Sequence, residues 1–247
     1  MMMLKKIFAA GLLSLCSISM ASADTLGARV GVGIWQPDVS GTFQFNGDSI
    51  DLQDDLFLKS GDNQDYVYAL FEHPIPLIPN IKISQTSLSL SGSGSVSADY
   101  TFGGTTYTAS TPVDTTMVLD HTETTIYYSL LDNWLHLDLG LTAKIFDGSA
   151  SVNNNSTNIE GTIPFLYVAA GIELPFINNL FFGIESNTLS IGDHTIQDMI
   201  AKVSYTTDWW LGFEVGVRTF TVELDDLDGN TSNMEFEGSF ANLYIHF

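Results

Sequence analysis

The last fourteen residues, 234–247, constrain the fold more than any other stretch of the sequence. Taken in steps of two, they give an apolar row that ends at the terminal aromatic residue: Ala241, Leu243, Ile245 and Phe247. The alternate row is mixed: Phe240, Asn242, Tyr244 and His246. Because successive side chains of a strand point to opposite faces, this alternation predicts a β-strand that runs to the C-terminus. If this strand closes a barrel, the rest of the chain is expected to supply the other strands.

Strand patterns recur along the chain and predict ten strands, with eight or twelve as alternatives. The clearest stretch is 134–146, where every second residue from Leu135 to Ile145 is apolar. The expected strands before the last are 26–36, 65–73, 81–92, 117–131, 134–146, 162–174, 180–189, a stretch ending at Tyr205, and 209–222. Tight turns alternate with longer, more polar loops between them. The fold class is therefore expected to be all-β, as an antiparallel up-and-down barrel.

A closing strand that ends in Phe247 is similar to that of Gram-negative outer-membrane β-barrels. There the terminal aromatic residue is an assembly signal for the barrel assembly machinery. Short turns at one end and long loops at the other are also typical of these barrels, in the periplasm and outside the cell respectively. The alternative is a soluble barrel of the lipocalin type, with its apolar residues inside. The apolar rows carry scarcely any charge, which favours the membrane barrel, since a charge facing lipid costs about 2–4 kcal/mol at the midplane.

The first 23 residues have the features of a cleaved signal peptide, with residues 24–247 as the barrel domain. Lys5 and Lys6 precede a short apolar run, and Ala21-Ser22-Ala23 forms a cleavage site. The single cysteine, Cys16, lies in that run, so the mature chain has no thiol. The expected location is the cell outer membrane. A formal net charge of −21 argues against nucleic acid as a partner.

Charged residues within the strands fall on the face opposite the apolar rows. We expect them to form a paired charge network in the lumen, because an unpaired buried charge is costly. Its expected members are Arg29, Glu72, Lys82, Glu123, Asp138, Lys144, Glu173, Glu185, Lys202, Glu214 and Arg218. Bulky residues are expected to fill the remaining space, beside strand glycines: Trp35, Phe165, Tyr167, Trp210 and Tyr244. The sequence thus predicts a narrow, largely occluded lumen.

Aromatic residues also gather at the predicted tight turns. They are Trp134, Phe176, Trp209, Trp210 and Phe247. A cluster of this kind at one end of the strands is typical of the aromatic girdle at a membrane interface. The same ends of the strands are therefore expected to lie at the periplasmic surface of the membrane.

Two long segments leave their structure open. In residues 37–64, Asn46-Gly47 is consistent with a hairpin turn, whereas residues 51–58 fit either an extended segment or a short helix. In residues 93–116, Gly103-Gly104 is the expected tip. The strand at 81–92 also changes its apolar phase, and a bulge near residues 84–86 would reconcile the two halves.

Several short motifs resemble an uncharacterised family of Gram-negative outer-membrane β-barrel proteins of similar length. They are HPIPLIPN at residues 73–80, YYSLLDN at 127–133, LPF at 174–176, GVR at 216–218, DDLDG at 225–229 and IHF at 245–247. The proline-rich turn is the most specific of them. The resemblance implies the fold and the location, and it brings no reaction or ligand.

We expect a structural or surface-interaction role through acidic extracellular loops, without enzymatic activity, catalytic residues, cofactor or resident metal. Expected partners are outer-membrane lipids and lipopolysaccharide, with divalent cations at the acidic loops, because carboxylates suit Ca²⁺ and Mg²⁺. A small-solute channel or transporter is the first alternative. The second is a hydrolase at the rim, similar to the omptin proteases, in which Asp193-His194 would face Asp225 and Asp226.

Overall fold

The computed structural model describes residues 26–75, 77–174, 176–177, 179–227 and 230–247. The expected signal peptide therefore lies outside the described residues, as do Pro76, Pro175 and Asp228-Gly229 of the family motifs. Within the described ranges, no helix is long and apolar enough to cross a membrane.

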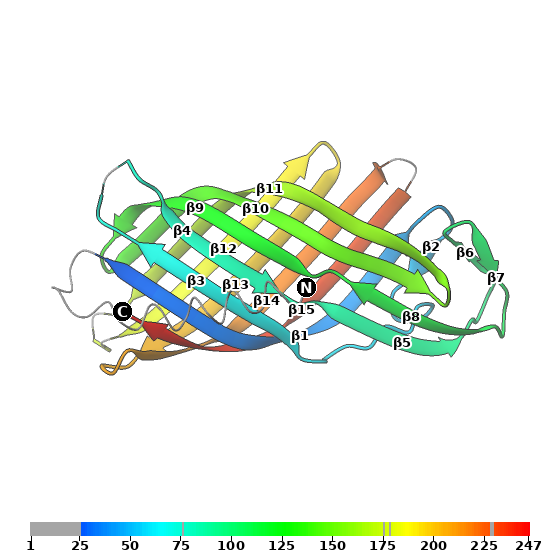
Figure 1. Ribbon diagram of the computed structural model, residues 1–247, viewed down its shortest axis with the longest axis horizontal. Helices are drawn as coiled ribbons and strands as arrows, with labels where there is room; N and C mark the ends of the chain where they lie inside the picture. The colour runs from blue at the N-terminus through cyan, green and yellow to red at the C-terminus, as the bar shows by residue number, and fades with distance from the viewer. Residues whose placement is uncertain (1–25, 76, 175, 178, 228–229) are drawn as a thin grey trace.

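Strands make up nearly all of the regular structure (Figure 1). Their bounds are β1 (Gly27–Gln44), β2 (Ser49–Asp51), β3 (Gln64–Glu72), β4 (Asn80–Thr86), β5 (Ser89–Ser95), β6 (Tyr100–Phe102), β7 (Thr105–Tyr107), β8 (Pro112–Val118), β9 (His121–Asp132), β10 (Leu135–Val152), β11 (Asn155–Glu173), β12 (Leu180–Ile191), β13 (His194–Thr206), β14 (Leu211–Leu227) and β15 (Asn230–His246). Antiparallel pairing links β1, β3, β4, β9, β10, β11, β12, β13, β14 and β15 in that order, and β15 returns to β1. The expected ten-stranded up-and-down barrel is confirmed.

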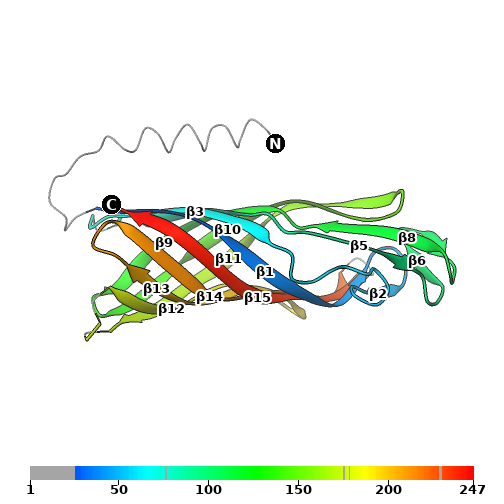
Figure 2. The same ribbon diagram turned by 90° about the horizontal axis from the view of Figure 1, so that it is seen from below.

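The two ends of the barrel differ in the length of their connections. One end, which we call the turn end, holds the tight connections around residues 73–79, 133–134, 174–179 and 207–210. The chain closes there, because Phe247 donates its N–H to the carbonyl of Ala28 at 2.8 Å and Ala28 donates back at 3.2 Å. At the opposite end, the loop end, β10 and β11 run far beyond the other strands, together with β2, β5, β6, β7 and β8 (Figure 2). This asymmetry is the one expected from the sequence.

The apolar face of each long strand changes sides part of the way along the barrel. On β10, Leu141 and Ile145 face outward and are 58% and 48% exposed, whereas Lys144 between them faces inward and is fully buried. Asp147, two residues after Ile145, also faces outward, and from there to Val152 the inward side chains are apolar. The barrel is thus polar inside and apolar outside towards the turn end, and the reverse towards the loop end.

The outward apolar residues form a continuous belt, which we call the apolar band. Cross-strand partners within it are themselves apolar, as in Val32 opposite Leu243 and Phe213 opposite Leu243. Members of the band include Val32, Ile34, Leu139, Leu141, Ile145, Leu166, Val168, Ile172, Val215, Val217, Leu243 and Ile245. A soluble protein rarely exposes so large an apolar surface, so this belt is where the barrel meets lipid.

The expected bulge near residues 84–86 is wrong. Ser84 pairs with Glu123 and Ser89 pairs with Val118, so β4 and β5 follow β9 and β8 in one unbroken register. Leu88 and Leu90 lie on the same inward phase as the polar residues before them, and both are 1% exposed. The apparent change of phase in the sequence is a change in what fills the interior.

Residues 37–64 fold into the loop end of the barrel. β1 continues to Gln44 and forms a hairpin with β2, with Asn46 at a positive φ of 43° in the turn, and residues 51–58 form turns rather than a helix. The backbone N–H of Leu52 bonds to Gly41 O on one wall, and that of Lys59 bonds to Ser91 O on another. The segment therefore spans the barrel interior.

Five side chains of this segment, Val39 among them, are buried in what we call the loop-end core. The core includes Ile50, Leu52, Leu56, Leu58, Leu88, Leu90, Val113, Met117, Phe146, Val152, Phe220 and Phe236. In residues 93–116, the β6–β7 hairpin turns at Gly103 and Gly104, both at positive φ, as expected. The loop end is consequently a packed apolar structure and not a set of open loops.

Strand glycines make room for rings in the lumen near the turn end. A Cβ built on Gly31 would lie 2.3 Å from the Tyr68 ring, and one on Gly212 would lie 2.0 Å from the Tyr244 ring. Trp35, Phe165, Tyr167 and Tyr244 are buried inside, as expected. The placement of Trp210 in the lumen is wrong, because this residue lies in a turn at a φ of 68° and is 60% exposed.

We expect Leu139→Lys to destabilise the inserted barrel by about 2–4 kcal/mol, because it places a cation in the apolar band. The matched control is Thr116→Lys, since Thr116 is exposed on β8 beyond the band. Thr142 does not suit as a control: it is 1% exposed and bonded to Thr125 and Asn187. Urea unfolding in lipid vesicles measures the effect, and equal tolerance of both lysines would contradict the assignment of faces.

Candidate functional site

Five buried residues form an ion-pair cluster inside the barrel, which we call the upper cluster. They are His121 and Glu123 of β9, Lys144 of β10, Asp198 of β13 and Arg218 of β14. Arg218 donates to Asp198 twice, from Nε to Oδ1 at 2.9 Å and from Nη2 to Oδ2 at 2.6 Å. Lys144 Nζ lies 2.6 Å from Asp198 Oδ2 and 2.9 Å from Glu123 Oε1. Two cations thus match two carboxylates, as burial of charge requires.

His121 completes the upper cluster as a hydrogen-bonding group. Its Nδ1 lies 2.8 Å from Leu119 O, which assigns a proton to Nδ1, and its Nε2 lies 3.3 Å from both Arg218 Nη2 and Glu123 Oε1. Among the described residues, His121, Glu123 and Asp198 are grouped closely enough to hold a metal ion. Lys144 and Arg218 already bind those carboxylates, so a metal ion would have to displace a permanent cation.

Aromatic rings join the upper cluster to the loop-end core. The guanidinium carbon of Arg218 lies 4.9 Å from the Trp35 ring centroid. Lys144 Nζ lies 4.9 Å from the centroid of Phe220. Both are cation–π contacts, which gain strength where water is excluded. The charged layer and the apolar layer therefore form one continuous packing across the lumen.

A second set of ion pairs, the lower cluster, lies closer to the turn end. Glu185 of β12 bridges Lys82 of β4 and Lys202 of β13, with both N–O distances at 2.5 Å. Lys202 also lies 3.1 Å from Glu214 Oε2, and Asn242 donates to Glu214 Oε1 at 2.9 Å. The charges of the lower cluster again balance, two against two.

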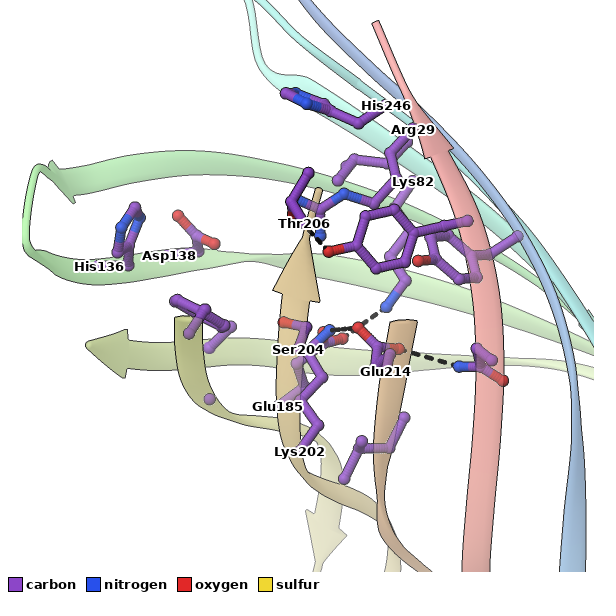
Figure 3. Close-up of a pocket in the computed structure, with 18 of the residues that line it drawn as sticks. Arg29, Lys82, His136, Asp138, Glu185, Lys202, Ser204, Thr206, Glu214 and His246 are labelled. Carbon is purple, nitrogen blue, oxygen red and sulfur yellow. Dashed lines mark hydrogen bonds and ion pairs between the residues drawn. The ribbon is translucent and has the colours of Figure 1, made fainter. Parts of the chain in front are cut away.

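A cavity of about 510 Å³ extends from the lower cluster to the turn end (Figure 3). Arg29 and His246 lie on one side of it, and His136 and Asp138 of β10 lie across from them. Tyr66, Tyr68, Tyr127, Tyr167, Phe181 and Tyr244 provide aromatic walls. The lining also includes the turn residues Asn179 and Asp208, so the cavity reaches the turn end of the barrel.

The mouth of the cavity is acidic. His136 lies 3.4 Å from Asp132 and 3.6 Å from Glu173, and Asp208 lies on the same rim. The carboxylates of Asp132 and Glu173 are largely exposed. A ligand that approaches this mouth first meets negative charge, which disfavours simple anions.

The residues expected in the lumen charge network occupy three places. Lys82, Glu185, Lys202 and Glu214 form the lower cluster, and Glu123, Lys144 and Arg218 belong to the upper cluster. Arg29, Glu72 and Asp138 line the cavity and form no salt bridge with any described residue, so they belong to neither cluster, although Arg29 and Glu72 lie near enough to interact electrostatically. Glu173 lies at the exposed mouth and not within the lumen, because β11 ends there.

Sequence reasoning missed Asp198 and did not connect His121 to the network. Asp198 lies four residues before Lys202 on β13, so the period of two places both on the inward face. The sequence pattern does not define where this strand begins, and Asp198 was therefore not assigned to it. His121 likewise shares its phase with Glu123, which was a usable signal.

The aromatic residues expected in the girdle all lie at the turn end. Trp134, Phe176, Trp209, Trp210 and Phe247 are all exposed there. At the loop end, the structure brings His194 to Asp225, whose backbone N–H donates to His194 Nδ1 at 3.1 Å. Asp193 is exposed beside it. The two halves of the rim motif that the sequence singled out are thus neighbours.

Comparison with known proteins identifies the fold. No family model matches the chain, and no curated protein matches its sequence, so the family suggested by the motifs stays a prediction. The chain is similar in fold to the outer membrane protease OmpT of Escherichia coli, with a TM-score of 0.53 and 10% identity over 93% of this chain and 99% of that one. The transport unit of the autotransporter AIDA-I of Escherichia coli matches with a TM-score of 0.39 and 9% identity over 97% of each chain.

The barrel and its apolar band place the protein in the outer membrane of a Gram-negative bacterium, with the turn end in the periplasm and the loop end outside. One expectation is corrected by the comparison. The protein was expected not to be an enzyme. The barrel that it resembles over 93% of its length is, however, that of a protease. The likeness itself concerns the fold, and the residues that would carry chemistry have to be argued separately.

Removing one cation from the upper cluster should cost much of the stability. Lys144→Met leaves two buried carboxylates against one cation, and we expect a loss of about 3–5 kcal/mol in the free energy of unfolding. Adding Asp198→Asn restores the balance, so the double variant should lose less than the sum of the single ones. Lys59→Met is the control, because Lys59 is exposed. Additive losses in urea unfolding would contradict the coupling.

Proposed function

We propose that the protein is a closed outer-membrane barrel that acts through its loop end, as a surface-interaction protein of the lipopolysaccharide layer. The observation that carries the proposal is the filling of the barrel above the cavity. Arg218 and Lys144 close the lumen at the upper cluster, and Leu52 and Phe236 of the loop-end core lie above them, fully buried. What the cell presents to its surroundings is then a packed, acid-rich module.

Two pairs of carboxylates support the choice of partner. Asp38 of β1 lies directly opposite Glu237 of β15, and Asp147 of β10 lies directly opposite Glu160 of β11. All four side chains face outward and are exposed just beyond the apolar band. Like charges directly opposite each other in a sheet are destabilising. A cation between them would remove that cost.

The position of these pairs fits the phosphates of lipopolysaccharide. They lie where the outward face changes from apolar to polar, at the level of lipid head groups. Mg²⁺ and Ca²⁺ take oxygen ligands from carboxylates and phosphates alike. Each pair would therefore bind a divalent cation that also contacts a phosphate, and so attach the barrel wall to the lipid layer.

Closure of the lumen predicts little or no steady conductance. Planar-bilayer recordings of the purified protein test this, with a wide porin as the positive control. The physical reason is the mixed and neutralised charge of a filled lumen, which leaves no continuous water path. Large, reproducible single-channel steps whose ion selectivity changes in Lys144→Glu would contradict it.

Neutralising one carboxylate should have an effect that depends on the lipid. In vesicles without lipopolysaccharide or divalent cations, Glu160→Gln relieves repulsion and should stabilise the barrel by at most about 1 kcal/mol. With lipopolysaccharide and Mg²⁺ present, that gain should vanish or reverse. Asp54→Asn, another exposed acid, is the control. The same shift under both conditions would argue against a bound cation.

A peptidase is the second candidate function, and the likeness in fold to a protease favours it. The loop end also holds His194 beside Asp225, with Asp193 next to it. In the neutral imidazole, Nδ1 accepts from the Asp225 backbone, so Nε2 carries the proton and a change of partner would be needed before it acts as a base. Cleavage of test peptides in lipopolysaccharide, lost in His194→Ala but kept in His136→Ala, would support it.

A further inference from the structure

The cavity at the turn end contains polar groups that the barrel itself leaves without partners. Arg29 stacks on Tyr244, with its guanidinium carbon 4.7 Å from the ring centroid, and forms no ion pair with any described residue. Its Nε is buried and has no hydrogen-bond partner. The hydroxyl of Tyr68 is also buried without a partner, on a side chain that is 5% exposed. Orphaned buried donors carry a desolvation cost that a ligand would remove.

These two donors belong to one part of the cavity wall. Arg29 and Tyr68 lie on the neighbouring strands β1 and β3, in which Gly31 is opposite Tyr68 and Arg29 is opposite Leu70. Both residues line the cavity. A guanidinium presents a planar fork of donors that matches a carboxylate, and the hydroxyl adds a further donor. The wall is therefore suited to hold a carboxylate group.

The remaining charges of the cavity indicate that the ligand also carries a positive group. Lys82 and Lys202 are neutralised by Glu185 and Glu214 in the lower cluster. Glu72 accepts one hydrogen bond, from Tyr127 at 2.8 Å, and no described cation pairs with it. Asp138 on the opposite side bonds to Ser129 and lies beside His136, and no described Lys or Arg forms a salt bridge with it. Among the described residues that line the cavity, Arg29 is thus a cation without a salt bridge, and Glu72 and Asp138 are carboxylates without one, although Arg29 and Glu72 lie near enough to interact electrostatically. The mouth of the cavity is acidic as well.

We propose that this cavity binds a small zwitterion with an aromatic side group, of the amino-acid class, from the periplasm. The carboxylate would bind Arg29 and Tyr68, and the ammonium group would face Glu72 and Asp138. Aromatic walls such as Tyr127 and Tyr167, whose ring centroids are 5.6 Å apart, suit a stacked ring. A volume of about 510 Å³ lies within the range of small-molecule sites. Binding in this cavity at the turn end is independent of the role proposed for the loop end.

Three matched probes test the charge requirement by calorimetric titration of the full-length barrel in detergent. They are phenylalanine, phenylalaninamide, which lacks the carboxylate, and 3-phenylpropionate, which lacks the ammonium group. We expect phenylalanine to bind more tightly than either. No saturable binding of phenylalanine, or binding no tighter than that of the other two, would overturn the proposal.

Variants locate the site. Tyr68→Phe removes only a hydroxyl without a partner, so it should fold normally and weaken phenylalanine binding by about threefold to tenfold. Arg29→Gln should abolish the preference for phenylalanine over phenylalaninamide. Glu72→Gln should instead reduce the preference over 3-phenylpropionate. Lys59→Gln removes an exposed cation and should bind as the unaltered protein does. Unchanged binding in both Tyr68→Phe and Arg29→Gln would show that the ligand lies elsewhere and would refute the site.

Discussion

The structure depends on one constraint, which is that each strand must reverse its apolar face where it leaves the lipid. Lipid demands an apolar exterior, and water beyond it demands a polar one. On β15, Leu243 faces lipid and Glu237 faces water, while the inward side chains change from Asn242 to Phe236. The part of the barrel towards the turn end therefore has the arrangement of a membrane barrel, with apolar residues outside. The part towards the loop end has the arrangement of a soluble barrel, with apolar residues inside.

This reversal decides what the lumen can hold. Where the outside is apolar, the inside collects charges, and these are tolerable only because they pair as Arg218 with Asp198 and as Lys82 with Glu185. Where the outside is polar, the inside is free to be apolar, and residues 37–64 supply Leu52 to fill it. The barrel is consequently filled towards the outside and keeps its open volume on the periplasmic side, where Arg29 forms no salt bridge with any described residue.

Much of the candidate site could be predicted from the sequence, and there is a physical reason why the rest could not. Alternation placed Lys144, Lys202 and Glu185 on the inward face, because the period of two fixes the face of a residue once its strand is known. Alternation does not fix the depth of a residue in the barrel. Glu173 has the right phase and still lies at the exposed mouth, since its strand ends there.

The sequence by itself favoured ten barrel strands over eight or twelve, and it predicted their order, the faces of most of their side chains and the membrane location. These follow from local periodicity, turn residues and the chemistry of lipid. Only the tertiary structure decided which charges meet, as Lys144 of β10 with Asp198 of β13, and that Leu88 faces inward without a bulge. Such contacts join strands far apart in the chain, and their partners depend on register and on the solvent at each level of the barrel. No pattern within a single strand contains that information.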